Sequence, residues 1–83
     1  MKHHTLKVRP KFYAPILDRQ LTGCMRRDDR GYEVGDMLRL EEFDPSTQEY
    51  TDRFITGVRI TYILRHQDIA DIPEGFALLS LRI

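Results

Sequence analysis

The chain has little of what stabilises many small secreted domains. It has a single cysteine, Cys24, among 83 residues, so it cannot form an internal disulfide or a zinc site made of cysteines alone. Secreted domains of this size usually depend on disulfides, and we therefore expect a protein of the reducing cytoplasm. Residues 1–5 carry no apolar segment behind their positive charge, so we expect no signal peptide. No apolar run approaches the roughly 18 residues that a membrane span needs.

The chain also lacks a net charge. Its 13 Lys and Arg residues balance its 13 Asp and Glu residues, which argues against a protein held to nucleic acid by bulk positive charge. A hydrophobic content of 41% and a charged content of 31% are typical of a globular protein. No repeat, linker or low-complexity tract divides the sequence, and we expect one domain over residues 1–83.

The balance of charge hides two segments of opposite sign. Residues 1–30 hold eight Lys or Arg against three Asp, whereas residues 31–52 hold one Arg against seven Asp or Glu. A basic segment suits a surface that faces phosphates. The two segments could instead pair with each other, because opposite charges on adjacent strands stabilise a sheet. Both interpretations remain open from the sequence.

Hydrophobic periodicity predicts one helix and five strands. The strands are expected over Thr5–Val8, Thr22–Arg27, Met37–Phe43, Arg53–Arg65 and Phe76–Ile83, with a helix from Pro10 to near Gln20. The apolar stripe of that helix consists of Phe12, Tyr13, Ile16 and Leu17. Pro15 clashes with the carbonyl four residues back, which leaves two turns separated by a break as an alternative.

The alternation of apolar and polar residues predicts which side chains of a strand share one face of the sheet. Leu38 and Leu40 share one face of their strand. The longest strand has its alternating apolar residues at Val58, Ile60, Tyr62 and Leu64. Gly57 in the same strand predicts a bulge, where a long strand bends. Long curved strands with one early helix favour a mainly β fold of the α+β class, built as a small, partly closed β-barrel.

Catalytic and metal-binding motifs are scarce. His3 and His4 are neighbours, which point to opposite faces of a strand, and His66 is isolated. We therefore predict no metal site and no cofactor. Cys24 lies close in sequence to Arg26, which could lower the pKa of its thiol. No histidine is nearby in sequence to act as its base, and a buried strand cysteine is the simpler interpretation.

The segment Arg26–Tyr32 is the clearest candidate for ligand binding. It joins three arginines, a turn-forming pair of aspartates and an aromatic ring. Arginines and the N–H groups of turns bind phosphate, and Tyr32 could stack on a base. The alternative is a solvated loop in which Asp28 and Asp29 neutralise the arginines.

Several blocks of the sequence, in order, resemble one known family. They are His4-x-Leu6-Lys7, Arg26–Asp36, Glu42–Pro45, Tyr50-Thr51-x-Arg53, Val58–Leu64, Pro73–Phe76 and Leu79–Leu81. Together they span residues 4–82 and resemble the short bacterial and phage proteins of unknown function placed with the ASCH domain, in the PUA-like superfamily. The resemblance implies a small PUA-like β-barrel with one short helix near the N-terminus. It also implies a groove beside that helix, proposed in the family to bind RNA.

Some ASCH relatives are hydrolases that remove the acetyl group from N4-acetylcytidine. They share a Gly-x-Lys-x-x-Glu-x-Arg signature and a neighbouring threonine. With Arg26 aligned to the signature arginine, Leu21 stands at the lysine and Cys24 at the glutamate, so only Thr22 and Arg26 remain. An amidohydrolase needs a base for its nucleophile and a proton donor for the leaving amine, and leucine supplies neither. Thr22 is therefore only a weak catalytic candidate.

The sequence thus predicts a non-catalytic module that binds RNA or another single-stranded nucleic acid through a basic groove. The residues expected to contact the nucleic acid are His4, Lys7, Arg26, Arg27, Asp29, Arg30 and Tyr32. Two alternatives remain. One is a small hydrolase acting on a modified nucleoside, and the other is a phage-encoded protein-interaction module that uses the acidic segment 33–52.

Overall fold

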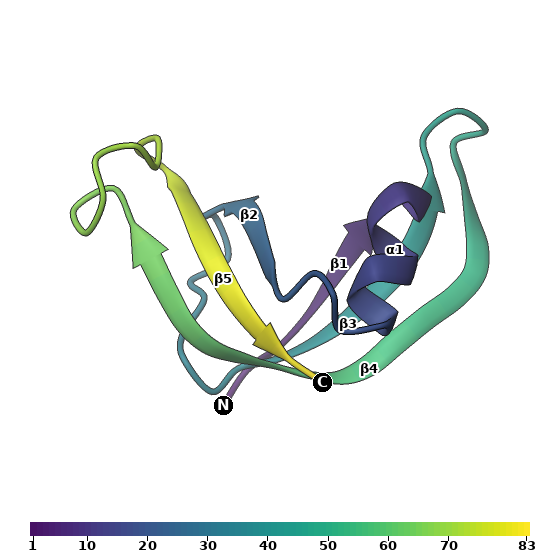
Figure 1. Cartoon of the computed structure of the whole chain (residues 1–83), viewed down its shortest axis with the longest axis horizontal. Helices are drawn as coiled ribbons and strands as arrows, with labels where there is room; N and C mark the ends of the chain where they lie inside the picture. Colours follow the sequence, from purple (N-terminus) through teal and green to yellow (C-terminus); the bar gives the residue numbers. More distant parts are fainter.

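The computed structural model describes all 83 residues and contains one helix and five strands (Figure 1). The strands are β1 (His3–Val8), β2 (Gly23–Arg27), β3 (Met37–Asp44), β4 (Glu49–Arg65) and β5 (Phe76–Arg82), and the helix is α1 (Pro10–Leu17). Every predicted element is present. The largest differences are that β4 begins four residues earlier than predicted and that α1 ends three residues before Gln20.

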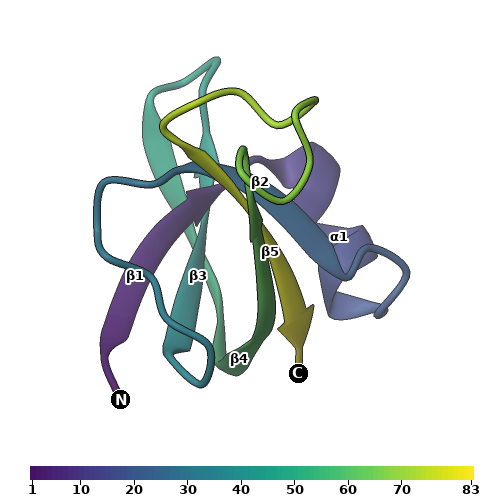
Figure 2. The same ribbon diagram turned by 90° about the vertical axis from the view of Figure 1, so that its left-hand side faces the viewer.

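All five strands belong to one sheet, in the order β1-β3-β4-β5-β2. β1 runs parallel to β3, and the other neighbours are antiparallel. The long strand β4 pairs with β3 along its first half and with β5 along its second half, and its bend curls the sheet around α1 (Figures 1 and 2). β1 and β2 are the two edges and do not pair with each other. The mainly β fold is confirmed as a curled half-barrel, while its PUA-like character stays a prediction.

Bulges explain the curvature of β4. The pairing with β3 shifts between Leu38 and Leu40, opposite Gly57, whose φ is +73°. The bulge predicted at Gly57 is confirmed, and glycine suits it because a positive φ costs little without a Cβ. A second shift, between Glu41 and Phe43, lies opposite Asp52, whose φ is +68°.

The core lies between the concave face of the sheet and α1. Its 14 buried residues are Leu6, Val8, Tyr13, Ile16, Tyr32, Leu38, Leu40, Ile55, Val58, Ile60, Ile63, Ala77, Leu79 and Leu81. Leu38 and Leu40 face it as predicted. Full burial of one such aliphatic side chain contributes about 1.5–3 kcal/mol, so this cluster is the main source of stability.

The predicted alternation of β4 is wrong beyond Ile60. Tyr62 is 60% exposed and Leu64 is half-buried, whereas Ile63 faces the core. A third bulge explains the difference, because the pairing of β4 with β5 shifts between Ile60 and Tyr62. A shift of one residue moves every following side chain to the opposite face of the sheet.

Helix α1 is continuous and contains Pro15, so the alternative of two separate turns is wrong. Tyr13 and Ile16 are buried, but Phe12 and Leu17 are 41% and 48% exposed. Only half of the predicted stripe therefore packs against the core. No helix of the structure has the length and apolar character that crossing a bilayer requires.

The end of α1 is a Schellman motif. The amide of Arg19 donates to the carbonyl of Ile16, and the amide of Gln20 donates to the carbonyl of Pro15. Arg19 takes the left-handed position of this motif, with φ at +62°. The turn that it makes directs the chain from α1 into the linker that precedes β2.

Candidate functional site

A groove lies between the open edges of the sheet, beside α1. Its volume is about 410 Å³. The ten residues that line it are Lys7, Val8, Arg9, Phe12, Ile16, Leu21, Gly23, Cys24, Met25 and Arg26. Three of them are cationic, none is acidic and most of the others are apolar. This lining fits a ligand that combines negative charge with apolar surface.

Arginine side chains span the opening between β1 and β2. The Arg26 guanidinium donates a hydrogen bond to the carbonyl of Lys7 (2.5 Å), and that of Arg30 donates to the carbonyl of Thr5 (2.6 Å). An edge strand leaves alternate backbone groups without a strand partner, and these two donors satisfy two carbonyls of β1. We call this set of contacts the clasp. It joins the two edges through side chains instead of a further strand pair.

Cys24 lines the groove beside Arg26 but is not an activated nucleophile. Burial raises the pKa of the Cys24 thiol, and the charge of Arg26 opposes this only in part. A thiol with a raised pKa stays protonated at neutral pH, and the thiolate is the reactive form. The structure therefore favours the simpler interpretation of Cys24 as a packed strand residue.

Lys7 lies at the rim of the groove. Its ammonium nitrogen is 4.5 Å from the ring centroid of Phe43 and 5.8 Å from that of Tyr50. It shares this side of the sheet with Glu41, its partner in the register of β1 and β3. Because Leu6 and Val8 on either side face the core, the Lys7 side chain projects from the outer face of β1, and its positive charge is held beside two aromatic rings next to the groove.

Arg9 is a groove residue that the sequence analysis did not select. It is the exposed N-cap residue of α1 and lies directly before Pro10. Its side chain forms no ion pair or hydrogen bond within the chain. One signal in the sequence could have identified Arg9 as a groove residue. It is a cation between a predicted strand and a helix that begins with proline, at the positive end of the helix dipole.

Two of the predicted nucleic-acid contacts lie in the interior, and this corrects the prediction. Nε2 of His4 is 2.9 Å from Oδ2 of Asp36, and the His4 ring packs edge-on against Tyr32 with the centroids 4.9 Å apart. Tyr32 is only 2% exposed. A base cannot reach its ring, so the predicted stacking role of Tyr32 is wrong, and the His4 side chain is similarly covered.

Asp36 organises this interior cluster. Its carboxylate accepts hydrogen bonds from the amides of Lys2 and Glu33, both at 3.0 Å, in addition to its contact with His4. The His4 contact, followed by the Lys2 amide, lowers the pKa of Asp36 to about 2, although burial opposes this shift. Asp36 is therefore ionised at neutral pH and ties the start of β1 to the loop before β3.

The other predicted contacts separate in space. Arg27 lies over the ring of Phe76 at 5.1 Å, on the outer face of the sheet, because neighbouring strand residues point to opposite faces. It therefore lies outside the groove, contrary to the single surface that we predicted. Asp29 is exposed and only 4.0 Å from Nε of Arg30. Lys7, Arg26 and Arg30 are the predicted cations that the structure gathers at the opening.

The two charged segments pair only in part. The charged side-chain contacts between the segments are Lys2–Glu33, at 3.5 Å, and His4–Asp36. Asp28 pairs with Arg65 at 2.7 Å and not with the arginines next to it in sequence. The cations that line the groove form none of these pairs, so their charge remains available to a ligand.

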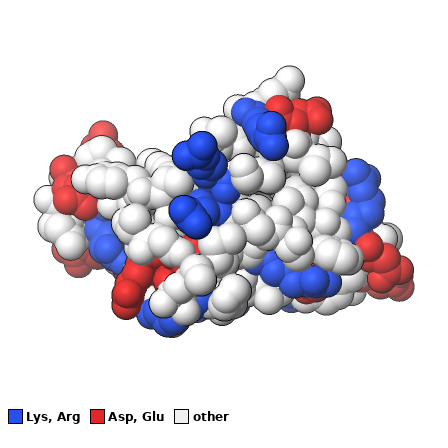
Figure 3. All heavy atoms as spheres, turned by 90° about the horizontal axis from the view of Figure 1, so that it is seen from below, with Lys and Arg blue, Asp and Glu red and all other residues white.

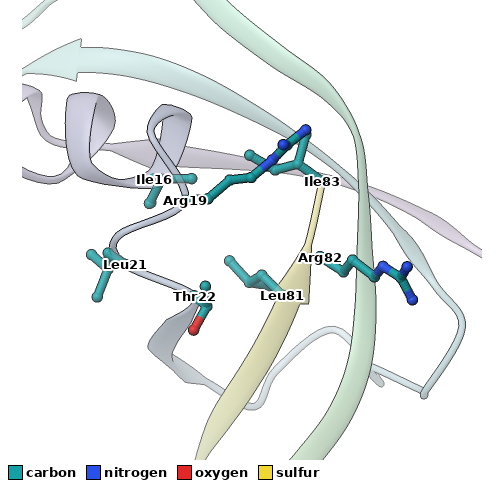
Figure 4. Close-up of a pocket in the computed structure, with 7 residues that line it drawn as sticks. All are labelled: Ile16, Arg19, Leu21, Thr22, Leu81, Arg82 and Ile83. Atoms are coloured by element: carbon teal, nitrogen blue, oxygen red, sulfur yellow. The ribbon is translucent and has the colours of Figure 1, made fainter.

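Thr22 lies in a second cavity of about 410 Å³, which shares Ile16 and Leu21 with the groove (Figure 4). The cavity is lined by Ile16, Arg19, Leu21, Thr22, Leu81, Arg82 and Ile83. No carboxylate or imidazole side chain is among them, and the Arg82 side chain points away from Thr22 in Figure 4. A hydroxyl nucleophile needs an adjacent base, and this cavity provides no side chain for that role.

Comparison with known proteins places the chain in a family. Residues 3–81 match the family described as Domain of unknown function (DUF3850). The chain belongs to this family. A comparison with curated proteins finds no match. The family match assigns no activity to this DUF3850 protein, and its relationship to the ASCH domain and the PUA-like superfamily stays a prediction. No group of three or more His, Cys, Asp or Glu side chains is placed to hold a metal ion.

Proposed function

We propose that this DUF3850 protein binds single-stranded nucleic acid, with RNA as the preferred form, in the groove beside α1. The observation that carries the proposal is the lining, where Lys7, Arg9 and Arg26 occur without any acidic residue. A single strand presents phosphates to cations and unstacked bases to apolar surface. A duplex presents mainly phosphates, so it would leave the apolar part of the groove unused.

Phe12 is the aromatic residue available for stacking in this groove. Its side chain lines the groove and is 41% exposed. Met25, also a lining residue, is 47% exposed. Stacking of a base on an aromatic side chain contributes about 1–3 kcal/mol. Phe12 thus takes the role that the sequence analysis assigned to Tyr32.

Arg26 can take part in the clasp and bind a phosphate at the same time. Its hydrogen bond to the Lys7 carbonyl comes from one terminal nitrogen. A guanidinium has further N–H donors in a planar fork, which bind phosphate in a bidentate manner. Ligand binding therefore does not require the edges of the sheet to separate, and the ligand should raise the melting temperature because it binds the folded form.

Fluorescence anisotropy with a short labelled RNA of mixed sequence tests the proposal, with the equivalent DNA strand and the RNA duplex as comparisons. The single-stranded RNA should bind most tightly. With three phosphate contacts, log affinity should fall with log salt at a slope of about −2, or about 0.7 per contact. Arg9→Ala and Arg26→Ala should each weaken binding and make the slope shallower by about 0.7. Phe12→Ala should weaken binding at every salt concentration.

Arg59→Ala is the matched control. It removes the same charge from an exposed residue outside the groove, and it should leave affinity and slope unchanged. The absence of RNA binding at low salt would contradict the proposal. Equal losses from Arg9→Ala and Arg59→Ala would also contradict it, because they would show an attraction that does not depend on the groove.

A further inference from the structure

The outer face of β4, β5 and β2 carries apolar side chains that nothing in the chain covers. The outer patch consists of Met25, Tyr62, Leu64, Phe76 and Leu78. Met25 lies opposite Leu78, and Leu78 lies opposite Leu64, so these three form one row across the strands. Tyr62 is 60% exposed and Met25 is 47% exposed, and the other three are partly exposed. Contiguous exposed apolar surface of this kind marks an interaction site.

Arginines lie at both ends of the outer patch. Arg59 and Arg82 are directly opposite each other on β4 and β5, and Arg27 lies beside Phe76 at the other end. None of the three forms an ion pair within the chain. Like charges directly opposite each other destabilise an antiparallel pair, so a carboxylate from outside would relieve this repulsion. Figure 3 shows Lys and Arg side chains in the middle of the face seen from below, with acidic side chains mostly toward its margins.

We propose that the outer patch binds a partner protein through a segment whose apolar side chains are flanked by carboxylates. The composition of the patch supports a protein partner, because Tyr, Phe, Met and Arg are enriched in protein interfaces while Lys, Asp and Glu are depleted. We expect carboxylates on the flanks of the partner segment because Arg27, Arg59 and Arg82 form no ion pair within the chain. Met25 is the one patch residue that also lines the groove, whereas Tyr62, Leu64, Phe76 and Leu78 lie outside it.

Two other occupants fit the outer patch less well. A second copy related by a two-fold axis would bring the arginines at the ends of its patch close to those of the first copy, and these like charges repel. A nucleic acid would meet a row of aliphatic side chains, Met25, Leu78 and Leu64, with Tyr62 as the one exposed ring beside it. Phe76 is itself covered by the Arg27 guanidinium.

Selection from a phage-displayed library of random peptides tests the proposal. The wild-type protein is the bait, and the double variant Met25→Ser/Tyr62→Ser serves for counter-selection. Both residues are about half exposed or more, so the variant keeps the core. The enriched peptides should combine apolar residues with Asp or Glu on their flanks. A synthetic copy of one should bind the double variant at least about tenfold more weakly, and Arg59→Glu should weaken it further as charge attraction turns to repulsion.

Tyr50→Ser is the control, because Tyr50 is also half exposed but lies on the β3–β4 hairpin. It should leave peptide affinity unchanged. Enrichment of basic or uncharged peptides, or failure to enrich any peptide selective for the wild-type protein, would overturn the proposal. A dimer in sedimentation that Met25→Ser/Tyr62→Ser dissolves would assign the patch to a second copy. Loss of RNA binding in Tyr62→Ser alone, a change outside the groove, would assign the patch to nucleic acid.

Discussion

Arg26 on β2 donates a hydrogen bond to the backbone carbonyl of Lys7 on β1, and both residues line the groove. This contact joins the two edges of the sheet that no strand pairing connects. The same side chain therefore stabilises the open side of the half-barrel and contributes charge to the proposed binding site. Stability and binding should respond together to changes at this residue.

Arg26→Ala should lower the free energy of unfolding by about 1–2 kcal/mol, because the variant loses a charge-assisted hydrogen bond to an edge carbonyl. Urea denaturation measures this change. Arg27→Ala is the matched control, since Arg27 is exposed and donates no hydrogen bond within the chain, and it should change stability by less than about 0.5 kcal/mol. Equal effects of the two substitutions would show that the clasp does not contribute to stability.

Stability should fall in acid because of Asp36. Its pKa is about 2 in the folded chain against an ordinary value of 3.8, so the folded form binds the proton less readily than the unfolded form. The resulting stabilisation is fully present above about pH 4 and is lost as the pH falls toward about 2. Asp44 acts in the same direction, since hydrogen bonds from Ser46 also lower its pKa.

Urea denaturation at a series of pH values separates the contributions of Asp36 and Asp44 to the free energy of unfolding. Asp36→Asn should be less stable at neutral pH and should lose less stability between about pH 4 and pH 2 than the wild-type protein. Asp44→Asn should give a smaller change, because Asp44 is not buried with its partners as Asp36 is. An unchanged acid profile in Asp36→Asn would contradict the role assigned to the His4–Asp36 contact.

The third bulge of β4 predicts that substitutions at two adjacent residues, Tyr62 and Ile63, have different effects on stability. Ile63→Ala should cost about 2–5 kcal/mol, because Ile63 belongs to the core. Tyr62→Ala should cost less than about 1 kcal/mol, because Tyr62 is 60% exposed. Thermal or urea denaturation compares them. A larger loss from Tyr62→Ala would restore the simple alternation that the sequence suggested.

The sequence predicts the elements of this fold better than their arrangement. Alternation identifies β3 and the face of Leu38 and Leu40, because these depend on neighbouring residues. Gly57 marks one bulge by its residue type, but the bulge after Ile60 has no glycine and follows from pairing with β5. The parallel contact of β1 with β3 joins distant segments, so no local pattern indicates it.

The sequence also predicts the residues of the candidate site only in part. Three arginines and a turn around Tyr32 are typical of a surface loop, yet His4 and Asp36 come from other segments and enclose the ring. Family resemblance and charge clustering both select Arg26, which lines the groove, and its contact with nucleic acid stays a prediction. Arg9 was missed because its importance arises from the position of α1 beside the sheet edges.

Arg19→Gly should stabilise the protein by up to about 1 kcal/mol. Arg19 occupies the left-handed position at the end of α1, with φ at +62°, where a side chain costs about 1–2 kcal/mol and glycine is favoured. The greater freedom of glycine in the unfolded chain offsets part of this gain. Arg19→Ala removes the same side-chain charge but retains a Cβ, so it should bring no comparable increase. Equal midpoints of urea unfolding for the two variants would show that backbone strain at Arg19 does not limit stability.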